Sequence, residues 1–252
     1  KMLLSAVLFD VDGTIAETED LHRKCFNESF KEFNLDWFWD EAIYRELINI
    51  GDGKERIEHY INRAWPEMLE YKNLTKYISS IHKVKNELFE DYILESKINL
   101  RPGFTRLIKN LKDNNVRIVS VSSTSEKNLI TLFERGLNID PSSTFDLIAH
   151  GDCTDNKRPS PEIYEWILEK LRLPSQSCIA IEDSLRGVES ARNANIEVLV
   201  TPSSYTKHES FKDAKVVVSD LGEKDRPFKK IKGNVFDHKF VDFKLLSRII
   251  KG

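Results

Sequence analysis

Two aspartates at the end of a short apolar run are the first residues in the chain that could do chemistry. The apolar segment 6–9 is followed by Asp10-Val11-Asp12-Gly13-Thr14. A buried strand that ends here would present two carboxylates at the carboxyl edge of a sheet, where open α/β folds bind their ligands. Neighbouring carboxylates repel each other unless a cation lies between them or one is protonated. The motif therefore predicts a divalent metal site and leaves one aspartate available for attack on a substrate.

Three further polar groups follow predicted strands or their loops. Ser122-Ser123-Thr124-Ser125 lies at a strand-to-helix turn, where hydroxyls and amides can bind phosphate. Lys157-Arg158-Pro159 supplies positive charge before a helix, and Glu182-Asp183-Ser184 supplies two more carboxylates. Each group alone is more often a helix cap or an exposed turn. Because a parallel sheet would gather all four at one edge, their conjunction predicts a Mg²⁺ site that binds a phosphoryl group.

The rest of the chain divides into a helical block and an alternating part. Apolar residues at helical spacing predict helices at 18–33, 40–50, 57–65 and 74–92. Beyond residue 101, helices are predicted at 104–114, 125–135, 161–171 and 184–195. Strands are predicted at 116–121, 145–149, 178–181 and 197–200, with an edge strand at 215–218. This alternation indicates an α/β fold with a doubly wound, mostly parallel sheet.

The first strand is separated from the others by about eighty helical residues. A one-stranded domain cannot fold, so the helical block is interpreted as an insertion into the sheet domain. We expect an α/β core of residues 1–15 and 97–252 and an inserted helical cap of residues 16–96, with a two-stranded hinge beside Asp10. The basic cluster in the tail (Lys229, Lys230 and Lys232) is interpreted as a solvated surface.

The composition limits which partners the protein is expected to bind and in which compartment it is expected to act. The net charge of −3 gives no indication of binding to nucleic acid or to an anionic membrane. Cys25, Cys153 and Cys178 lie far apart, which argues against a disulfide framework and a zinc site and favours a reducing compartment. No apolar run approaches the ~18–20 residues that span a bilayer. We expect a monomer that acts on a small molecule in the cytoplasm, or in the plastid stroma if the source is a photosynthetic eukaryote.

The four motifs resemble those of the haloacid dehalogenase-like phosphatases. They are the stretch from Phe9 to Thr14, Ser122, the basic residue before Pro159, and Glu182-Asp183. Segments 35–40, 44–47, 53–57 and 202–209 are further similar to the CbbY-type subfamily, which is related to β-phosphoglucomutase. Members of that subfamily hydrolyse xylulose-1,5-bisphosphate, an inhibitor of the carbon-fixing enzyme Rubisco. The resemblance implies a Rossmann-like core with an inserted cap and a phosphatase that releases xylulose 5-phosphate.

The resemblance also implies a mechanism. Asp10 attacks phosphorus to form an aspartyl-phosphate intermediate. Asp12 protonates the leaving sugar oxygen and then deprotonates the water that hydrolyses the intermediate. Mg²⁺ is held by Asp10, the Asp12 carbonyl, Glu182 and Asp183, and it shields the nucleophile from the incoming anion.

Ser122 and the Ser123 amide are implied to hold the transferring phosphoryl oxygens. The superfamily usually has lysine immediately before the proline of its basic motif. In this sequence that place holds Arg158, with Lys157 one residue earlier. The guanidinium fork of arginine suits phosphate well, so both residues stay candidates.

Substrate recognition is expected from the cap. The candidates are Glu17, His22, Tyr44, Arg45, Lys54 and Arg56, together with the turn at Gly53. A substrate with two phosphates needs a second anion site away from the metal, which cap cations could provide. From spacing alone, Arg45, Lys54 and Arg56 are better interpreted as surface charges on helices, and His22 as a satisfied helical histidine. The family resemblance favours recognition.

Two other functions stay open at this point. A sugar phosphomutase of the β-phosphoglucomutase type would have the same core and cap. A catalytically silent binding protein with this fold is disfavoured because Asp10, Asp12, Ser122, Glu182 and Asp183 are all retained. True dehalogenases and phosphonatases of the superfamily generally lack the second aspartate, so Asp12 argues against both.

Overall fold

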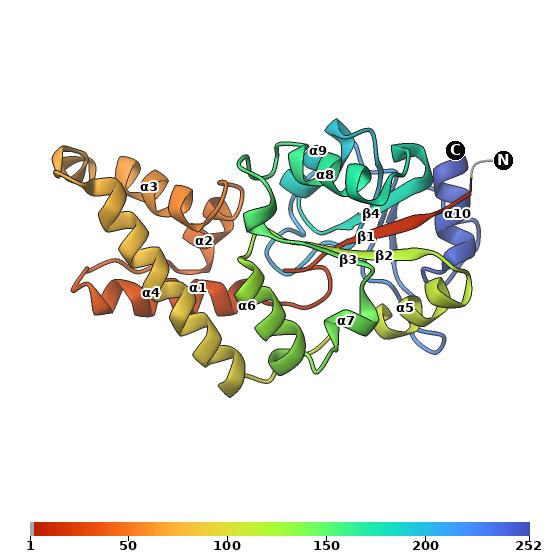
Figure 1. Cartoon of the computed structure of the whole chain (residues 1–252), viewed down its shortest axis with the longest axis horizontal. Coiled ribbons are helices and arrows are strands. Elements are labelled where there is room, and N and C mark those ends of the chain that lie inside the picture. Colours follow the sequence, from red (N-terminus) through yellow and green to blue (C-terminus); the bar gives the residue numbers. More distant parts are fainter. Residues whose placement is uncertain (1–2) are drawn as a thin grey trace. The chain divides into compact units, whose positions relative to one another are not determined.

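The computed structural model describes residues 3–252, which form two compact units. One unit combines the described residues up to Glu17 with Ile98–Gly252, and the other is Thr18–Lys97. In Figure 1 the first strand, in red, lies among the green and blue segments of the α/β unit, whereas the orange segments form the helical unit. Within residues 3–252, no helix combines the length and the apolar character that crossing a membrane requires.

The α/β unit is built on a seven-stranded sheet of order β3-β2-β1-β4-β5-β6-β7. The strands are β1 (Ala6–Asp10), β2 (Arg117–Val121), β3 (Leu147–Ala149), β4 (Cys178–Glu182), β5 (Glu197–Val200), β6 (Val216–Val218) and β7 (Lys230–Lys232). Every neighbouring pair is parallel except β6 and β7. The predicted doubly wound, mostly parallel sheet is confirmed. Strand order reverses between β1 and β4, which is where such sheets bind ligands.

Helices cover both faces of this sheet (Figure 1). They are α5 (Phe104–Asp113), α6 (Glu126–Thr131), α7 (Pro141–Thr144), α8 (Glu162–Leu171), α9 (Leu185–Asn193) and α10 (Phe243–Lys251), with short helical turns η2 (Leu132–Gly136), η3 (Gly151–Cys153) and η4 (Ser175–Ser177). Ala6 and Leu8 of β1 pack with α8 and α9. Phe9, on the opposite face, contacts Phe104 of α5 edge-on, with ring centroids 5.5 Å apart. Burial on both faces explains why β1 is apolar throughout rather than alternating.

The tail differs from the sequence-based expectation. Residues 215–218 were predicted as an edge strand, but β7 pairs antiparallel with β6 and takes the edge. The basic cluster (Lys229, Lys230 and Lys232) is exposed, as expected, and Lys232 Nζ also donates to the carbonyls of Phe211 at 2.8 Å and Ala214 at 3.0 Å. The tail then ends in α10, which buries an apolar face against the α/β core. A strand of three residues is too short for its alternation to be a signal, so only its pairing partner reveals it.

The helical unit consists of α1 (Glu19–Glu32), α2 (Glu41–Leu47), α3 (Gly53–Ala64), η1 (Pro66–Glu70) and α4 (Leu74–Glu95). Its core is aromatic, and the ring of Trp39 lies 4.8 Å from those of both Phe26 and Phe30. The side chains of Asp40 and Asp52 cap α2 and α3 by accepting from backbone N–H groups. Rings and caps thus order α1, α2 and α3, whose lengths of 14, 7 and 12 residues would leave them marginal in water.

The two segments that link the units pair with each other inside the α/β unit. Ala16 and Leu100 form an antiparallel bridge, and the Arg101 N–H donates to the Ile15 carbonyl at 2.8 Å. The chain therefore leaves the α/β unit a few residues after Asp12 and re-enters it along a segment that pairs with the exit.

Candidate active site

Three buried carboxylates meet at the carboxyl edge of the sheet. Asp10 ends β1 and Glu182 ends β4, and these strands are hydrogen-bonded neighbours. One oxygen from each of Asp10, Glu182 and Asp183 lies within 4.8 Å of the others. The Thr14 hydroxyl donates to Asp10 Oδ2 at 2.9 Å. The parallel sheet therefore brings together acids that lie about 170 positions apart in the sequence.

Arg158 lies at this acidic group, and Lys157 does not. Arg158 Nη1 donates to Asp10 Oδ1 at 2.7 Å and to Glu182 Oε1 at 2.9 Å. Its Nη2 lies 3.5 Å from the Ser123 hydroxyl. Lys157 Nζ instead donates to backbone carbonyls in its own loop, including that of Thr154 at 2.6 Å. Of the two basic candidates, the structure places the arginine beside the Asp10 carboxylate.

Burial and neighbouring charges shift the pKa values of Asp10 and Arg158 strongly. Burial, with repulsion from Glu182, raises the pKa of Asp10 to about 7, although Arg158 opposes the shift. Burial alone would lower the pKa of Arg158, but Glu182 and Asp10 raise it well above its ordinary value. A buried guanidinium is thus held charged by two acids, while a surplus of negative charge remains at the site.

Tyr164 is a site residue that the sequence-based reasoning missed. Its hydroxyl donates to Glu182 Oε1, the oxygen that also accepts from Arg158. Burial and the Glu182 carboxylate raise the pKa of Tyr164 well above its usual range, so it serves as a neutral donor. The residue lies on the apolar face of α8. From the sequence pattern, a tyrosine on an apolar helix face is interpreted as a core residue. Only the tertiary structure, which brings its hydroxyl to the end of β4, makes it a partner of Glu182.

Asp12 and the serine-rich turn form a second group. Asp12 is half-buried, and the Thr124 hydroxyl lies 3.4 Å from its Oδ2. Ser122 is fully buried, and its hydroxyl accepts from the Thr124 N–H at 3.0 Å. Ser125 caps α6 by accepting from Asn128 N–H. The turn therefore contains both the helix cap and the hydroxyls expected for phosphate, and Thr124 joins the candidates named from sequence.

The acidic group fits a hard divalent cation. Within residues 3–252, Glu182 Oε2 is buried without a hydrogen-bond partner. It faces Gly187 so closely that a Cβ there would lie 1.9 Å away. Carboxylate oxygens in this arrangement are the ligands that Mg²⁺ prefers. Asp12 is not a member of the three-carboxylate group, so the side chains that fit as ligands are Asp10, Glu182 and Asp183.

The helical unit holds two polar clusters of its own. In the first, the Tyr44 hydroxyl donates to Glu19 Oε2 at 3.0 Å and accepts from Arg56 Nη1 at 3.1 Å. Arg56 is buried, and its Nε donates to the Ile50 carbonyl at 3.2 Å. Two residues predicted for substrate recognition, Tyr44 and Arg56, are therefore brought together and fixed by one carboxylate.

The second cluster joins His22 to Lys85. His22 Nδ1 lies 2.8 Å from Lys85 Nζ, and its ring stacks on Phe89 with centroids 4.1 Å apart. Lys85 Nζ also lies 5.0 Å above the Phe26 ring. Sequence reasoning missed Lys85, although its place on the buried face of α4, four residues from both Ile81 and Phe89, is a usable signal.

The remaining predicted recognition residues are members of neither cluster. Gly53 begins α3, and a Cβ there would come within 2.4 Å of His82 Nε2. Lys54 is exposed on the first turn of α3, and Arg45 of α2 is half-buried. Glu17 belongs to the α/β unit, where its carboxylate accepts from the Ser204 N–H and hydroxyl, each at 3.2 Å.

Comparison with known proteins identifies the family. A model of the haloacid dehalogenase-like hydrolases matches residues 7–201. The chain belongs to this family. Protein CbbY of Cereibacter sphaeroides is 38% identical over 221 residues, which cover 88% of this chain and 94% of that protein. The predicted family and the prediction of an enzyme, a phosphatase of this hydrolase type, are confirmed.

Solved structures agree. The crystal structure of a CbbY mutant from Rhodobacter sphaeroides in complex with xylulose-1,5-bisphosphate has a TM-score of 0.79 at 38% identity, covering 88% of this chain and 98% of that one. A β-phosphoglucomutase from Clostridium difficile has a TM-score of 0.70 at 25% identity, covering 86% and 91%. Hydrolases of this family generally use Mg²⁺, in agreement with the buried acidic group.

Proposed function

We propose that the protein is a magnesium-dependent phosphatase that hydrolyses xylulose-1,5-bisphosphate to xylulose 5-phosphate. The observation that carries this proposal is that the two aspartates of one motif lie in different surroundings. Asp10 is buried between Arg158 and the other acids, whereas Asp12 is half-buried beside a hydroxyl-rich turn. The substrate is proposed because it is the ligand of the similar CbbY structure.

Asp10 is the nucleophile in this proposal. Arg158 on Oδ1 and Thr14 on Oδ2 fix the plane of its carboxylate. One Asp10 oxygen forms a bond to phosphorus as the bond from phosphorus to the sugar oxygen breaks. Mg²⁺, held by Asp10, Glu182, Asp183 and the Asp12 carbonyl, would supply the positive charge that lets an anionic carboxylate approach an anionic phosphoryl group.

Asp12 transfers the protons. It gives its proton to the departing sugar oxygen and later takes a proton from the water that cleaves the aspartyl-phosphate. The Thr124 hydroxyl orients its carboxylate. Ser122 and the Ser123 amide bind phosphoryl oxygens, and Arg158 adds positive charge at the same place.

The helical unit, taken as the cap, recognises the sugar and its second phosphate. The residues proposed to contact the substrate are Glu17 of the α/β unit and His22, Tyr44, Arg45, Gly53, Lys54 and Arg56 of the helical unit. Lys54 is the cation best suited to the second phosphate because it is exposed at a helix N-terminus. A monomeric state, and a cytoplasmic or plastid location, stay predictions.

Two substrates test the proposal. With Mg²⁺, we expect the protein to release inorganic phosphate from xylulose-1,5-bisphosphate, and chelation of the metal should stop the release. β-Glucose 1-phosphate tests the phosphomutase alternative. Isomerisation of this sugar without phosphate release would contradict the phosphatase proposal.

A further inference from the structure

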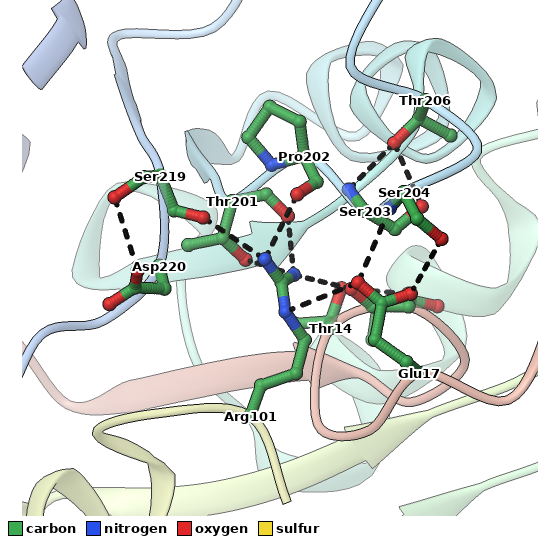
Figure 2. A network of polar contacts seen from close by, with 12 residues as sticks. Thr14, Glu17, Arg101, Thr201, Pro202, Ser203, Ser204, Thr206, Ser219 and Asp220 are labelled. Atoms are coloured by element: carbon green, nitrogen blue, oxygen red, sulfur yellow. Dashed lines mark hydrogen bonds and ion pairs between the residues drawn. The ribbon is translucent and has the colours of Figure 1, made fainter. Parts of the chain in front are cut away.

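Arg101 lies in a cage of oxygen atoms next to the Asp10-x-Asp12 motif. Its side chain is 9% exposed. Nη1 donates to the carbonyls of Gly13 and Thr201, and Nη2 donates to the carbonyls of Pro202 at 2.9 Å and Ser219 at 3.1 Å. Figure 2 shows the guanidinium between the segment that follows β5 and the one that follows β6. Arg101 thus links three parts of the chain to the segment that re-enters the α/β unit.

The cage suits a guanidinium better than any other side chain. Its acceptors are backbone carbonyls and the Thr201 hydroxyl, which lies 3.1 Å from Nη1. These carbonyls lie beyond the ends of their strands, where ladder hydrogen bonds stop, and a buried carbonyl left unpaired is costly. Five donors in a rigid plane can satisfy several of them at once, whereas a lysine ammonium has three donors at one point.

Gly13 is the acceptor that connects Arg101 to the chemistry. Its N–H donates to the Ala16 carbonyl at 2.7 Å, and its carbonyl accepts from Arg101. Its φ of +86° is left-handed, and a Cβ would lie 2.2 Å from Asp183 Oδ2. The residue that follows Asp12 is therefore held at both its N–H and its carbonyl, in a conformation that packs directly on an acid of the site.

Glu17 holds the guanidinium from the other side. Its Oε1 lies 3.8 Å from Arg101 Nε, and its carboxylate accepts from Ser204 (Figure 2). The arginine is therefore fixed by a charge as well as by carbonyls, and it has little freedom to release Gly13.

We propose that Arg101 is a positioning residue for Asp12: by holding the Gly13 carbonyl, it fixes the turn that aims the Asp12 carboxyl at the leaving oxygen. This inference rests on the proposed function, because it assigns to Asp12 the proton transfer of that reaction. Arg101 itself contacts neither substrate nor reacting atoms.

Leaving groups of different basicity test the inference. A sugar alkoxide must be protonated as it leaves, whereas p-nitrophenolate leaves without a proton. We expect Arg101→Lys to lower kcat/KM for xylulose-1,5-bisphosphate roughly 10- to 100-fold. For p-nitrophenyl phosphate we expect a fall of less than about threefold, since general acid catalysis contributes little there. An equal fall for both substrates would indicate a merely structural role and overturn the proposal.

Arg106 offers a matched control. It is partly buried, and its guanidinium also donates to backbone carbonyls, those of Gly222 and Val241 at 2.8 Å, but these lie in the C-terminal segment rather than in the motif. Arg106→Lys should therefore leave the ratio of the two kcat/KM values unchanged. If this ratio changes as much as in Arg101→Lys, loss of any arginine that binds backbone carbonyls has the same effect, and the proposal is overturned.

Hydrogen exchange of the protein without substrate provides a readout that does not depend on activity. Peptides that cover residues 11–17 should exchange slowly in the wild type and faster in Arg101→Lys, with the peptides of α4 unchanged. Fast exchange of 11–17 in the wild type would overturn the proposal, and this measurement needs no folded variant. Unchanged exchange of the same peptides in a folded variant would also overturn it. If the wild type hydrolyses neither substrate, the proposed function fails, and exchange alone decides whether Arg101 holds the turn.

Discussion

The acidic site of the α/β unit and the His22–Lys85 cluster of the helical unit bury charge in different ways. At the sheet edge, Arg158 is paired directly with Asp10 and Glu182, so opposite charges lie within hydrogen-bond distance. In the helical unit, Lys85 contacts the His22 imidazole and the faces of two aromatic rings. The first arrangement holds fixed charges in place at the position where charge develops during a reaction. The second rigidifies the interior of the helical unit, because His22, Lys85 and Phe89 are all buried.

The difference follows from how each region is built. The sheet delivers Asp10 and Glu182 from adjacent parallel strands, so one topological rule places the reacting groups. The clusters of the helical unit depend on side-chain packing between helices, as between His22 of α1 and Lys85 of α4. Substitutions in the first region should therefore affect the chemical step, and those in the second should affect substrate binding or stability.

The largest effect should come from Asp10→Asn. Without an ionised carboxylate the variant cannot form the aspartyl-phosphate, and we expect kcat to fall by at least about 10⁴-fold, as for other enzymic nucleophiles. The measurement is phosphate release from xylulose-1,5-bisphosphate. Circular dichroism of the variant checks that it folds. Turnover at the wild-type rate by a folded variant would refute Asp10 as the nucleophile.

The next largest effect is expected from the two basic residues of the motif, whose substitutions should lower kcat to different extents. Arg158→Met removes the donor shared by Asp10 and Glu182, and we expect kcat to fall about 10²- to 10³-fold. Lys157→Met removes contacts to loop carbonyls, so we expect a change of less than about tenfold. Steady-state kinetics of both variants make the comparison. The reverse order of effects would move the phosphate-binding role to Lys157.

In the helical unit, Lys54→Ala should act on binding. Loss of a charged contact to the second phosphate should raise KM for xylulose-1,5-bisphosphate roughly 10- to 100-fold. KM for p-nitrophenyl phosphate, which has one phosphate, should stay close to the wild-type value. The control is Lys83→Ala, since Lys83 is another exposed lysine, which pairs with Glu87 on α4. A similar rise for both substrates would argue against a second-phosphate site at Lys54.

The smallest effect concerns stability and pH. Burial, aided by the charge of Lys85, lowers the pKa of His82 to about 3 from the 6.5 of a free histidine. Between these values the unfolded chain binds the proton more readily, so the stabilising contribution is full above pH 6.5 and is lost as the pH falls toward 3.

His82→Gln tests this linkage. We expect the variant to reduce the slope of unfolding free energy against pH by roughly 1 kcal/mol per pH unit between pH 4 and 6. Urea unfolding at a series of pH values measures the slope. The exposed His59→Gln provides the control. If both variants keep the wild-type slope, His82 does not titrate as its surroundings indicate.

Several features could be predicted because they follow from local sequence. The apolar run that ends in Asp10-x-Asp12 indicated a central strand, and the βα alternation after residue 101 indicated the parallel sheet. The antiparallel β7 could not be predicted, because a three-residue charged strand is specified by its neighbour β6 rather than by its own pattern. The same holds for Tyr164, which looks like any core tyrosine until β4 lies beside it.

By itself, the sequence determined the family, the sheet and the set of acids, because periodicity and motif order are properties of the chain. Only the tertiary structure decided between Lys157 and Arg158 at the acidic group, joined His22 to Lys85, and enclosed Arg101 among carbonyls that begin with Gly13 and end with Ser219. The physical reason is the same in each case. A hydrogen bond between residues far apart in the chain depends on where strands end and how loops return, and no local pattern encodes that distance.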